Sequence, residues 1–256
     1  MSSLTCYQFP YGSDNYGVLV NDASTGETAC IDAGDAKAVM DALKKNGWTL
    51  THLLITHHHA DHTAGLLDIK KATQCHVTGP VQLSSPIEGL DSEVGDADEF
   101  QFANRTVKVI HTPGHTKDMV NFHFPDDKLV FTGDTLFSMG CGRLFEGDAA
   151  MMLSSVNKLK QLPDDTLVYC AHEYTATNAR FALDVDPDNG EVASRFEEVA
   201  QLRNADKATV PVLMQLEKKT NPFLRTDNAQ LKASLGMEDA DDVAVFAALR
   251  KRRDQY

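Results

Sequence analysis

Four histidines and one aspartate lie within six consecutive residues of this chain, in the segment Thr56–His62, which reads THHHADH. The apolar run Leu50–Ile55 before it predicts a buried strand, and a helix is predicted after it, from Thr63 to Lys71. A loop between a strand and a helix, at the end of a sheet, is where α/β proteins place their ligand sites. The segment therefore favours an α/β fold with a site at one edge of a sheet.

The spacing within this segment suits two groups of metal ligands. His57 and His59 are two residues apart, so both rings can point the same way in an extended loop while His58 points elsewhere. Asp61 and His62 begin the next helix and can turn toward a neighbouring point. A surface histidine cluster or a terminal tag would lack the buried strand before it. Histidine and carboxylate groups placed in this way indicate a metal centre, and two groups suit two metal ions side by side.

This segment alone does not offer enough ligands for two metal ions. Three further candidates, His115, Asp134 and His172, each come directly after a predicted strand. Each has a plain structural explanation when taken singly, as a turn aspartate or as a histidine bonded to the backbone. Together they recur at strand ends, where loops could converge on one edge of a sheet. The remaining histidines are interpreted as structural: His52, His58, His76, His111 and His123.

Strands and helices mix up to about residue 172, and helices dominate beyond it. The predicted strands are 4–9, 16–20, 28–32, 50–56, 75–78, 105–111, 119–124, 128–132 and 166–170. The predicted helices are 35–46, 63–71, 149–162, 175–183, 191–204, 228–234 and 241–253. The sequence therefore predicts a large α/β domain over residues 1–172 and a small helical domain over residues 173–256.

Charge and composition exclude some classes of protein. The net charge of −13 argues against a protein that binds nucleic acid, whose surface would be basic. No apolar run approaches the ~20 residues of a membrane helix, and Met1–Phe9 lacks the pattern of a secretory signal. The five cysteines are scattered and form no CxxC pair, which favours free thiols in a reducing compartment. We expect a cytoplasmic monomer with neither a membrane nor a nucleic-acid partner.

Three motifs, in order, carry a resemblance to a known superfamily: THHHADH, then TPGHT at 112–116, then TGDTLF at 132–137. They resemble the metallo-beta-lactamase superfamily, and within it the chain is similar to the glyoxalase II (hydroxyacylglutathione hydrolase) family. The closer similarity rests on segments 13–16, 133–137, 140–147 and 171–175 and on the basic C-terminal end. It covers essentially the whole chain. It implies an αβ/βα sandwich, two sheets face to face with helices outside, and a small C-terminal all-helical domain.

The resemblance also implies the ligands of a dinuclear centre. By that resemblance the first metal would be bound by His57, His59 and His115, the second by Asp61, His62 and His172, and Asp134 would bridge them. The catalytic group would be a hydroxide bridging two divalent ions, held beside Asp61 and Asp134. Zinc is the expected metal, with iron and manganese as alternatives, because histidine and carboxylate ligands suit all three.

The implied substrate is a small-molecule glutathione thioester, S-D-lactoylglutathione or another S-(2-hydroxyacyl)glutathione. Its hydrolysis to glutathione and D-lactate is the second step of methylglyoxal detoxification. By the same resemblance, the glutathione moiety would be held by Arg143, Tyr174, Arg250 and Arg253. Charge alone would leave the basic end as a solvated helix terminus.

The chain departs from the family pattern at a few positions. Phe145 stands where the family often has tyrosine, Ala33 where it often has proline, and Lys117-Asp118-Met119 where a Gly-His pair is common. Alternatives are another hydrolase of the same fold, a glutathione persulfide dioxygenase that uses one iron, and a metal-binding protein without activity. Residues 173–256 favour the thioester hydrolase over the other enzymes, and the full ligand set speaks against an inactive protein.

Overall fold

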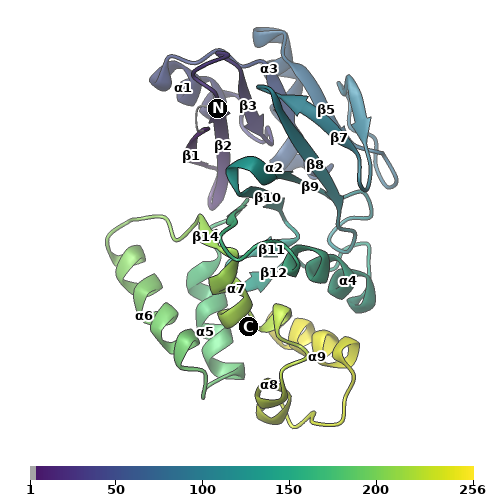
Figure 1. Cartoon of the computed structure of the whole chain (residues 1–256), viewed down its shortest axis with the longest axis vertical. Helices are drawn as coiled ribbons and strands as arrows, with labels where there is room; N and C mark the ends of the chain where they lie inside the picture. The colour runs from purple at the N-terminus through teal and green to yellow at the C-terminus, as the bar shows by residue number, and fades with distance from the viewer. Residues whose placement is uncertain (1–3) are drawn as a thin grey trace. The chain divides into compact units, whose positions relative to one another are not determined.

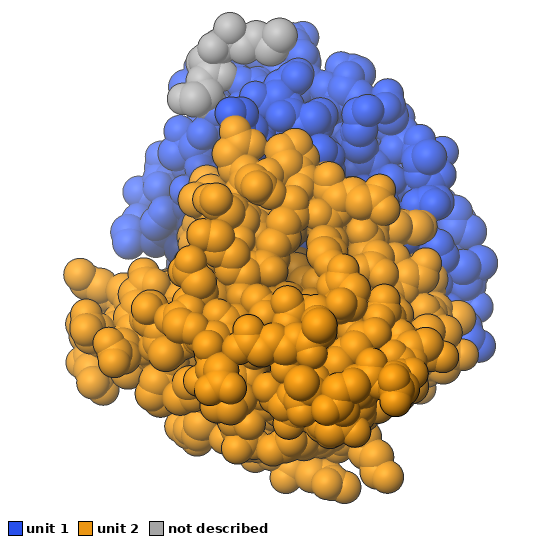
Figure 2. All heavy atoms as spheres, turned by 60° about the horizontal axis from the view of Figure 1, so that its bottom comes forward, with its two compact units in different colours: residues 1–111, 116–133 blue, residues 112–115, 134–256 orange. Residues whose placement is uncertain are grey.

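The computed structural model describes residues 4–256, so the first three residues of the segment inspected for a signal lie outside it. The chain forms two compact units, coloured separately in Figure 2. Unit 1 runs to His111 and continues with Thr116–Gly133, and unit 2 comprises Thr112–His115 and Asp134–Tyr256. Within the described part of the chain, no helix combines the length and the apolar character needed to cross a membrane.

The first sheet of unit 1 has six strands in the order β1-β2-β3-β4-β5-β6. Of these, β1, β2, β3 and β5 are labelled in Figure 1. The strands are β1 (Thr5–Tyr11), β2 (Asn15–Asn21), β3 (Thr28–Ile31), β4 (His52–Leu54), β5 (His76–Pro80) and β6 (Ser92–Val94). The pairs β1–β2 and β2–β3 are antiparallel, whereas β3 to β6 run parallel. The carboxyl ends of β3 and β4 therefore meet at the same edge, and the segment Thr56–His62 follows β4 there.

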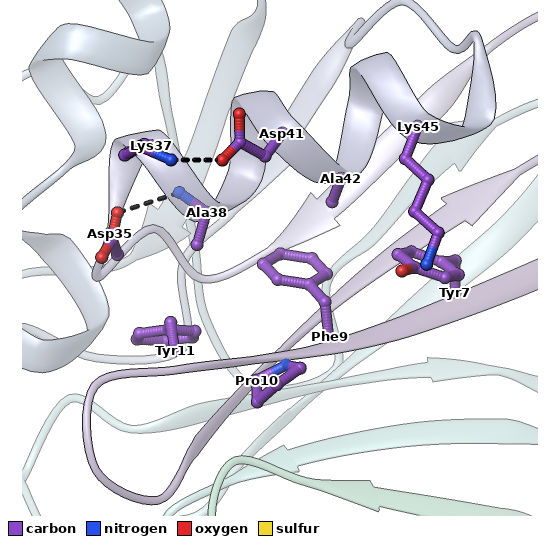
Figure 3. Close-up of a pocket in the computed structure, with 10 residues that line it drawn as sticks. All are labelled: Tyr7, Phe9, Pro10, Tyr11, Asp35, Lys37, Ala38, Asp41, Ala42 and Lys45. Atoms are coloured by element: carbon purple, nitrogen blue, oxygen red, sulfur yellow. Dashed lines mark hydrogen bonds and ion pairs between the residues drawn. The ribbon is translucent and has the colours of Figure 1, made fainter.

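Two helices cover the outer face of this sheet, α1 (Ala36–Asn46) and α3 (Leu66–Thr73). Alternate strand residues such as Leu19 and Leu53 pack against helix residues such as Leu43 in one buried apolar cluster. A surface groove remains between β1 and α1 (Figure 3), where Lys45 lies over the ring of Tyr7 at 5.2 Å from its centroid. None of the predicted metal ligands is among the residues that line this groove.

The second sheet of unit 1 is an antiparallel meander whose strands lie in the order β10-β9-β8-β7. Its strands are β7 (Glu99–Phe102), β8 (Arg105–His111), β9 (Val120–Phe124) and β10 (Leu129–Gly133), and the 3-10 helix η1 (Pro125–Asp127) joins the last two. The two sheets are in contact, because the ring of Phe102 lies 5.3 Å from that of His52 in β4. The buried guanidinium of Arg105 also pairs with Asp22, which follows β2, and with Asp127. Unit 1 is thus built from two facing sheets.

Unit 2 is mainly helical. Its elements are β11 (Leu136–Phe137), β12 (Gly140–Cys141), α4 (Ala149–Lys160), β13 (Leu167–Cys170), α5 (Thr175–Val185), α6 (Gly190–Asn204), β14 (Val212–Leu213), α7 (Met214–Thr220), η2 (Pro222–Leu224), α8 (Ala229–Ser234) and α9 (Asp242–Asp254). The short segment Thr112–His115 belongs to unit 2 by its contacts. The hydroxyl of Ser155 in α4 donates to the backbone oxygen of Pro113 at 2.6 Å, and the backbone nitrogen of Gly147 donates to the backbone oxygen of Gly114 at 3.0 Å.

The predicted order of α/β elements followed by helices is confirmed, but some elements differ. The single helix expected over 63–71 was wrong in extent, since the structure has α2 (Ala60–Thr63) and then α3. The helices are interrupted where the nitrogen of Gly65 donates to the oxygen of Ala33 at 2.7 Å. The pattern did not predict β6, β7, β11, β12, β14 or α7. Most of these are strands of two to four residues, too short for an alternating pattern to be recognised.

Candidate functional site

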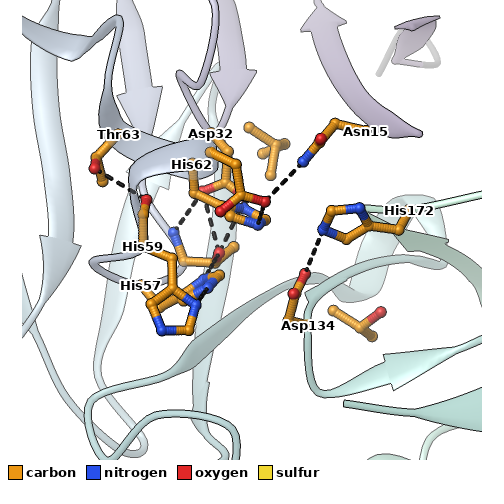
Figure 4. Close-up of polar contacts among 12 residues, drawn as sticks. Asn15, Asp32, His57, His59, His62, Thr63, Asp134 and His172 are labelled. Carbon is orange, nitrogen blue, oxygen red and sulfur yellow. Dashed lines mark hydrogen bonds and ion pairs between the residues drawn. The ribbon is translucent and has the colours of Figure 1, made fainter. Parts of the chain in front are cut away.

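Unit 1 brings two of the predicted ligands together directly after β4 (Figure 4). Nε2 of His57 lies 3.1 Å from Nδ1 of His59, and the His57 side chain is fully buried. Nδ1 of His57 faces the hydroxyl of Thr56 at 3.0 Å. The close approach of two imidazole nitrogens follows from the spacing of two residues in an extended loop. These two rings therefore present nitrogen atoms to one point, as two ligands of one metal ion do.

His62 and Asp61 form a second group on α2. Nδ1 of His62 lies 2.8 Å from Oδ2 of Asp32, which follows β3. An ionised carboxylate only accepts hydrogen bonds, so Nδ1 carries the proton and Nε2 keeps the lone pair that a metal needs. That Nε2 is 3.3 Å from Oδ2 of Asp61, which also accepts a hydrogen bond from Asn15 at 3.0 Å (Figure 4).

The loop after β3 holds α2 in place. Asp32 has a left-handed backbone with φ of 60° and accepts hydrogen bonds from the nitrogen and the hydroxyl of Thr56. Two residues later, a Cβ on Gly34 would lie 1.8 Å from the backbone oxygen of Asp61, so only glycine allows this approach. The hydroxyl of Tyr11 donates to the same oxygen at 3.0 Å. The position of Asp61 is therefore fixed by contacts from β1 and from the end of β3.

Unit 2 gathers the other three predicted ligands around one carboxylate. Asp134 is 7% exposed, with one oxygen 3.4 Å from Nε2 of His115 and the other 3.3 Å from Nε2 of His172. The second of these contacts is drawn in Figure 4. Nδ1 of His115 lies 2.9 Å from the carbonyl oxygen of Arg143, so His115 also keeps its lone pair on Nε2. A carboxylate with one histidine at each oxygen has the geometry required to bridge two metal ions.

The residue directly after β12, Gly142, must be glycine because the backbone there runs very close to Asp134. A Cβ on Gly142 would lie 2.0 Å from the backbone oxygen of Asp134 and 3.1 Å from Nδ1 of His115. Aromatic rings complete the surroundings. Tyr174 stacks on His172 with centroids 4.7 Å apart, and Phe145, which is 62% exposed, lies 5.2 Å from His115.

Three arginines of unit 2 form a cationic cluster, although they differ in exposure. Arg143 is exposed, whereas Arg250 is 5% exposed and donates to the oxygen of Cys141 at 2.8 Å. Arg250 also pairs with Asp254 at 2.9 Å. Arg250 thereby joins α9 to the segment 140–147, called here the glycine-rich segment. Burial lowers the pKa of Arg253, and the charges of Arg250 and Arg143 lower it further. The positive charges of the three arginines repel one another, and an anionic ligand would offset that repulsion.

The donor atoms fit divalent metal ions. Each unit offers imidazole nitrogens together with a carboxylate, the set that zinc, iron and manganese share. Cys141 on β12 is buried, and burial raises its pKa to about 11. That sulfur therefore remains a thiol and is no thiolate ligand.

The structure thus places the predicted residues in two sets. Unit 1 gathers His57, His59, Asp61 and His62, and unit 2 gathers His115, Asp134 and His172 together with Arg143, Tyr174, Arg250 and Arg253. Sequence reasoning assigned no site role to Asp32 or Asn15. Asp32 directly follows a parallel strand next to β4, so the rule of strand ends was a signal that could have found it.

Two family models match the chain, and they meet between residues 172 and 173. Residues 12–172 match the metallo-beta-lactamase superfamily, and residues 173–256 match the hydroxyacylglutathione hydrolase C-terminus. A hydroxyacylglutathione hydrolase of Rhizobium meliloti is 48% identical over 256 residues, all of both chains. One of Brucella anthropi is 51% identical over 249 residues, 97% of this chain and 96% of the relative.

Solved structures share the fold at lower identity. A metallo-beta-lactamase from Staphylococcus aureus is 21% identical with a TM-score of 0.67, covering 99% of this chain and 72% of its own. The structure of ETHE1 from Myxococcus xanthus is 27% identical with a TM-score of 0.60, covering 91% of this chain and 99% of its own. The two facing sheets of unit 1, and the group of histidine and aspartate side chains in each unit, thus belong to a chain that is similar to proteins of the metallo-beta-lactamase superfamily.

Proposed function

Because this chain belongs to the hydroxyacylglutathione hydrolase (glyoxalase II) family of the metallo-beta-lactamase superfamily, we propose that it hydrolyses S-D-lactoylglutathione to glutathione and D-lactate. It is a metal-dependent thioester hydrolase by family. The proposal concerns three points: the acyl group of the substrate, the number and identity of the metal ions, and the residues that bind these ions. The single observation that carries it is Asp134, whose two oxygens each face a histidine.

The proposed metal centre has two divalent ions, with zinc as the resident metal. The ligands are His57, His59 and His115 for the first ion, Asp61, His62 and His172 for the second, and Asp134 for both. Two ions held by these residues would supply a water of lowered pKa as the nucleophile and a positive charge for the carbonyl oxygen. The geometry within each unit supports this set, because Asp32 and the Arg143 carbonyl oxygen leave lone pairs on Nε2 of His62 and His115.

The chain's own residues then need to hold the thioester and let the thiolate leave. Arg143 and Arg253 are the proposed partners of the glutathione carboxylates, and Tyr174, fixed by its stacking on His172, would contact the peptide. Arg250 keeps the glycine-rich segment in place through the oxygen of Cys141. A thiol has a pKa near ~8.5, so the glutathione thiolate departs without a strong acid. The proposal accordingly assigns no serine or cysteine nucleophile.

Residues 1–172 would act in this proposal as the catalytic domain, and residues 173–256 as the domain that binds glutathione. The family models support this division because they meet at the same boundary. We also propose that the protein is a cytoplasmic monomer. The buried thiols Cys30, Cys141 and Cys170 are consistent with a reducing compartment.

A hydrolysis assay with S-lactoylglutathione tests the function directly, run beside a β-lactam and a simple aryl ester. We expect turnover of the thioester and much slower reaction of the other two substrates. Preference for the β-lactam would contradict the proposal. Metal analysis of the same preparation should give close to two equivalents, whereas one tightly bound iron with no second ion would favour a mononuclear enzyme.

A further inference from the structure

Asn178 on α5 links two parts of unit 2 that the proposed function treats separately. Its side chain is 4% exposed, so both of its polar ends must be satisfied inside the protein. Oδ1 accepts two hydrogen bonds from Arg253 on α9, from Nε at 3.2 Å and from Nη2 at 3.1 Å. Nδ2 donates to the backbone oxygen of Ser138 at 3.0 Å, in the turn of the β11–β12 hairpin.

This turn is itself held firmly. The fully buried carboxylate of Glu217 accepts hydrogen bonds from the hydroxyl of Ser138 and the nitrogen of Met139, both at 2.9 Å. Asn221 donates to the oxygen of Gly140 at 2.9 Å. The hairpin follows Asp134 by two residues, so a group bonded to it has a fixed position relative to that segment of the chain.

The neutral side chain of Asn178 distinguishes this contact from the arginine–carboxylate pairs of unit 2. The neighbouring Arg252 pairs with the carboxylate of Asp184 at 2.7 Å, and the buried Arg195 pairs with that of Glu198 at 2.7 Å. A carboxylate would neutralise the guanidinium, whereas an amide oxygen orients it through hydrogen bonds and leaves its positive charge in place. The positive charges of Arg250 and Arg143 and the negative charge of Asp254 all act on Arg253. Asp254 pairs with Arg250 at 2.9 Å, whereas the side chain that Arg253 contacts in Asn178 is neutral, so the charge of Arg253 remains available to an anion.

We propose that Asn178 is a positioning residue that orients Arg253 toward a carboxylate of the glutathione moiety without neutralising it. The inference rests on the proposed function, because Arg253 is there a partner of glutathione. Asn178 does not touch the substrate in this proposal. Its contribution to substrate binding passes through Arg253 alone, and that distinguishes it from a residue that merely stabilises the fold.

A double-mutant cycle tests this dependence. Asn178→Ala should raise KM for S-lactoylglutathione by ~10-fold, the loss that corresponds to about 1.4 kcal/mol, with little change in kcat. The same substitution in an Arg253→Ala background should raise KM no further, because the side chain to be oriented is gone. Additive effects in the two backgrounds would overturn the proposal. If Asn178→Ala yields little folded protein, Asn178→Ser takes its place in the cycle.

Charge is tested with Asn178→Asp, which keeps an oxygen beside Arg253 but adds a negative charge. We expect KM to rise at least as far as in Asn178→Ala and to depend less on salt than in the unaltered protein. A KM equal to that of the unaltered protein would show that the positive charge is not needed. The matched control is Arg252→Ala, which removes the neighbouring arginine that already has a carboxylate partner and should leave KM unchanged.

Two measurements separate this proposal from a structural role and from the proposed function. A small neutral thioester without glutathione should react with the same kcat/KM in the Asn178 variants and the unaltered protein, and a parallel loss there would mean a structural role. Calorimetric binding of glutathione itself should weaken in Asn178→Ala. If the unaltered protein neither binds glutathione nor hydrolyses the thioester, the proposed function fails; if it does both but the cycle is additive, only the role of Asn178 fails.

Discussion

Nδ1 of His58 donates to the carboxylate of Asp118 at 3.1 Å, and the Asp118 side chain is completely shielded from solvent. His58 stands between His57 and His59, and Asp118 stands in the segment before β9 of the facing sheet. Nearby, the nitrogen of Val120 donates to the oxygen of Thr56 at 3.0 Å. The loop that carries the predicted ligands is therefore fastened to the second sheet at two points. The departure Lys117-Asp118-Met119 thus supplies a contact to the loop that carries the predicted ligands.

Replacing Asp118 by alanine should weaken metal binding. Without the carboxylate, His58 and its two neighbours lose a fixed anchor, and loss of such supporting contacts costs ~10–100-fold in metal affinity. Competition with a chromophoric chelator measures the affinity directly. Asp126→Ala removes an exposed aspartate from η1 and serves as the control. Unaltered affinity in Asp118→Ala, with a lower free energy of unfolding, would assign the pair to stability alone.

Replacing Asp134 by alanine should remove metal and almost all activity. This carboxylate lies between His115 and His172 and contacts both. We expect kcat to fall by ~10²–10³-fold or more, the scale of losing one preorganised electrostatic contact. Metal content per chain, measured after gel filtration, should fall in parallel. Turnover at the rate of the unaltered protein would refute the bridging role.

Replacing Arg253 by alanine should affect substrate binding more than chemistry. In the proposed function the guanidinium holds glutathione equally in the ground state and in the transition state, so KM should rise by ~10-fold while kcat changes little. Steady-state kinetics with S-lactoylglutathione provide the check. A chain truncated after Leu249 lacks the whole basic end of the sequence, residues 250–253. Unchanged kinetics in this truncated chain would contradict the role of α9.

The stability of the fold should fall in mild acid in part through His123. Burial lowers the pKa of His123 on β9, and the nearby Lys108 lowers it further. Its folded pKa is thus below the unfolded value of about 6.5, so the unfolded state takes up the proton first and stability falls as the pH drops below about 6.5. Urea unfolding at about pH 7.5 and about pH 5.5 measures this loss, and His123→Gln should reduce the difference between the two. Equal differences in both proteins would exclude a contribution from His123.

The cysteines should differ sharply in their reactivity. Burial raises the pKa of Cys141 to about 11 and that of Cys170 to about 12, so both remain thiols near neutral pH. Cys6 on β1 is only half-buried. A thiol reagent should therefore modify Cys6 first in the native protein and all five cysteines in denaturant. Rapid native modification of Cys141 would contradict its burial beside Arg250.

The sequence predicted the parts of the site that depend on short spacing. The alternation around His58 predicts that His57 and His59 face the same way, and the structure brings their nitrogens within 3.1 Å; their role as ligands stays a prediction. The support of His62 by Asp32 joins residues 30 positions apart, and only strand pairing brings them together. No local pattern contains such a contact. The family resemblance, by contrast, predicted the fold class, which the family models confirm.

The short helices and strands illustrate a second limit. The break between α2 and α3 arises because Gly65 donates to Ala33, which belongs to a loop far away in the sequence. The β11–β12 hairpin has two residues in each strand and is held by Glu217 and Asn221 from the C-terminal part of the chain. Tertiary contacts define both elements, so local propensity could not.

The segment Thr112–His115 has a consequence for how the chain is made. It leaves the ribosome between strands of unit 1 but belongs to unit 2, whose remaining residues are synthesised only after Gly133. A nascent chain therefore already contains His57, His59 and His62 well before Asp134 and His172 have been synthesised. With the proposed ligand set, the metal centre is completed only late in synthesis, and chains released before His172 would lack part of it.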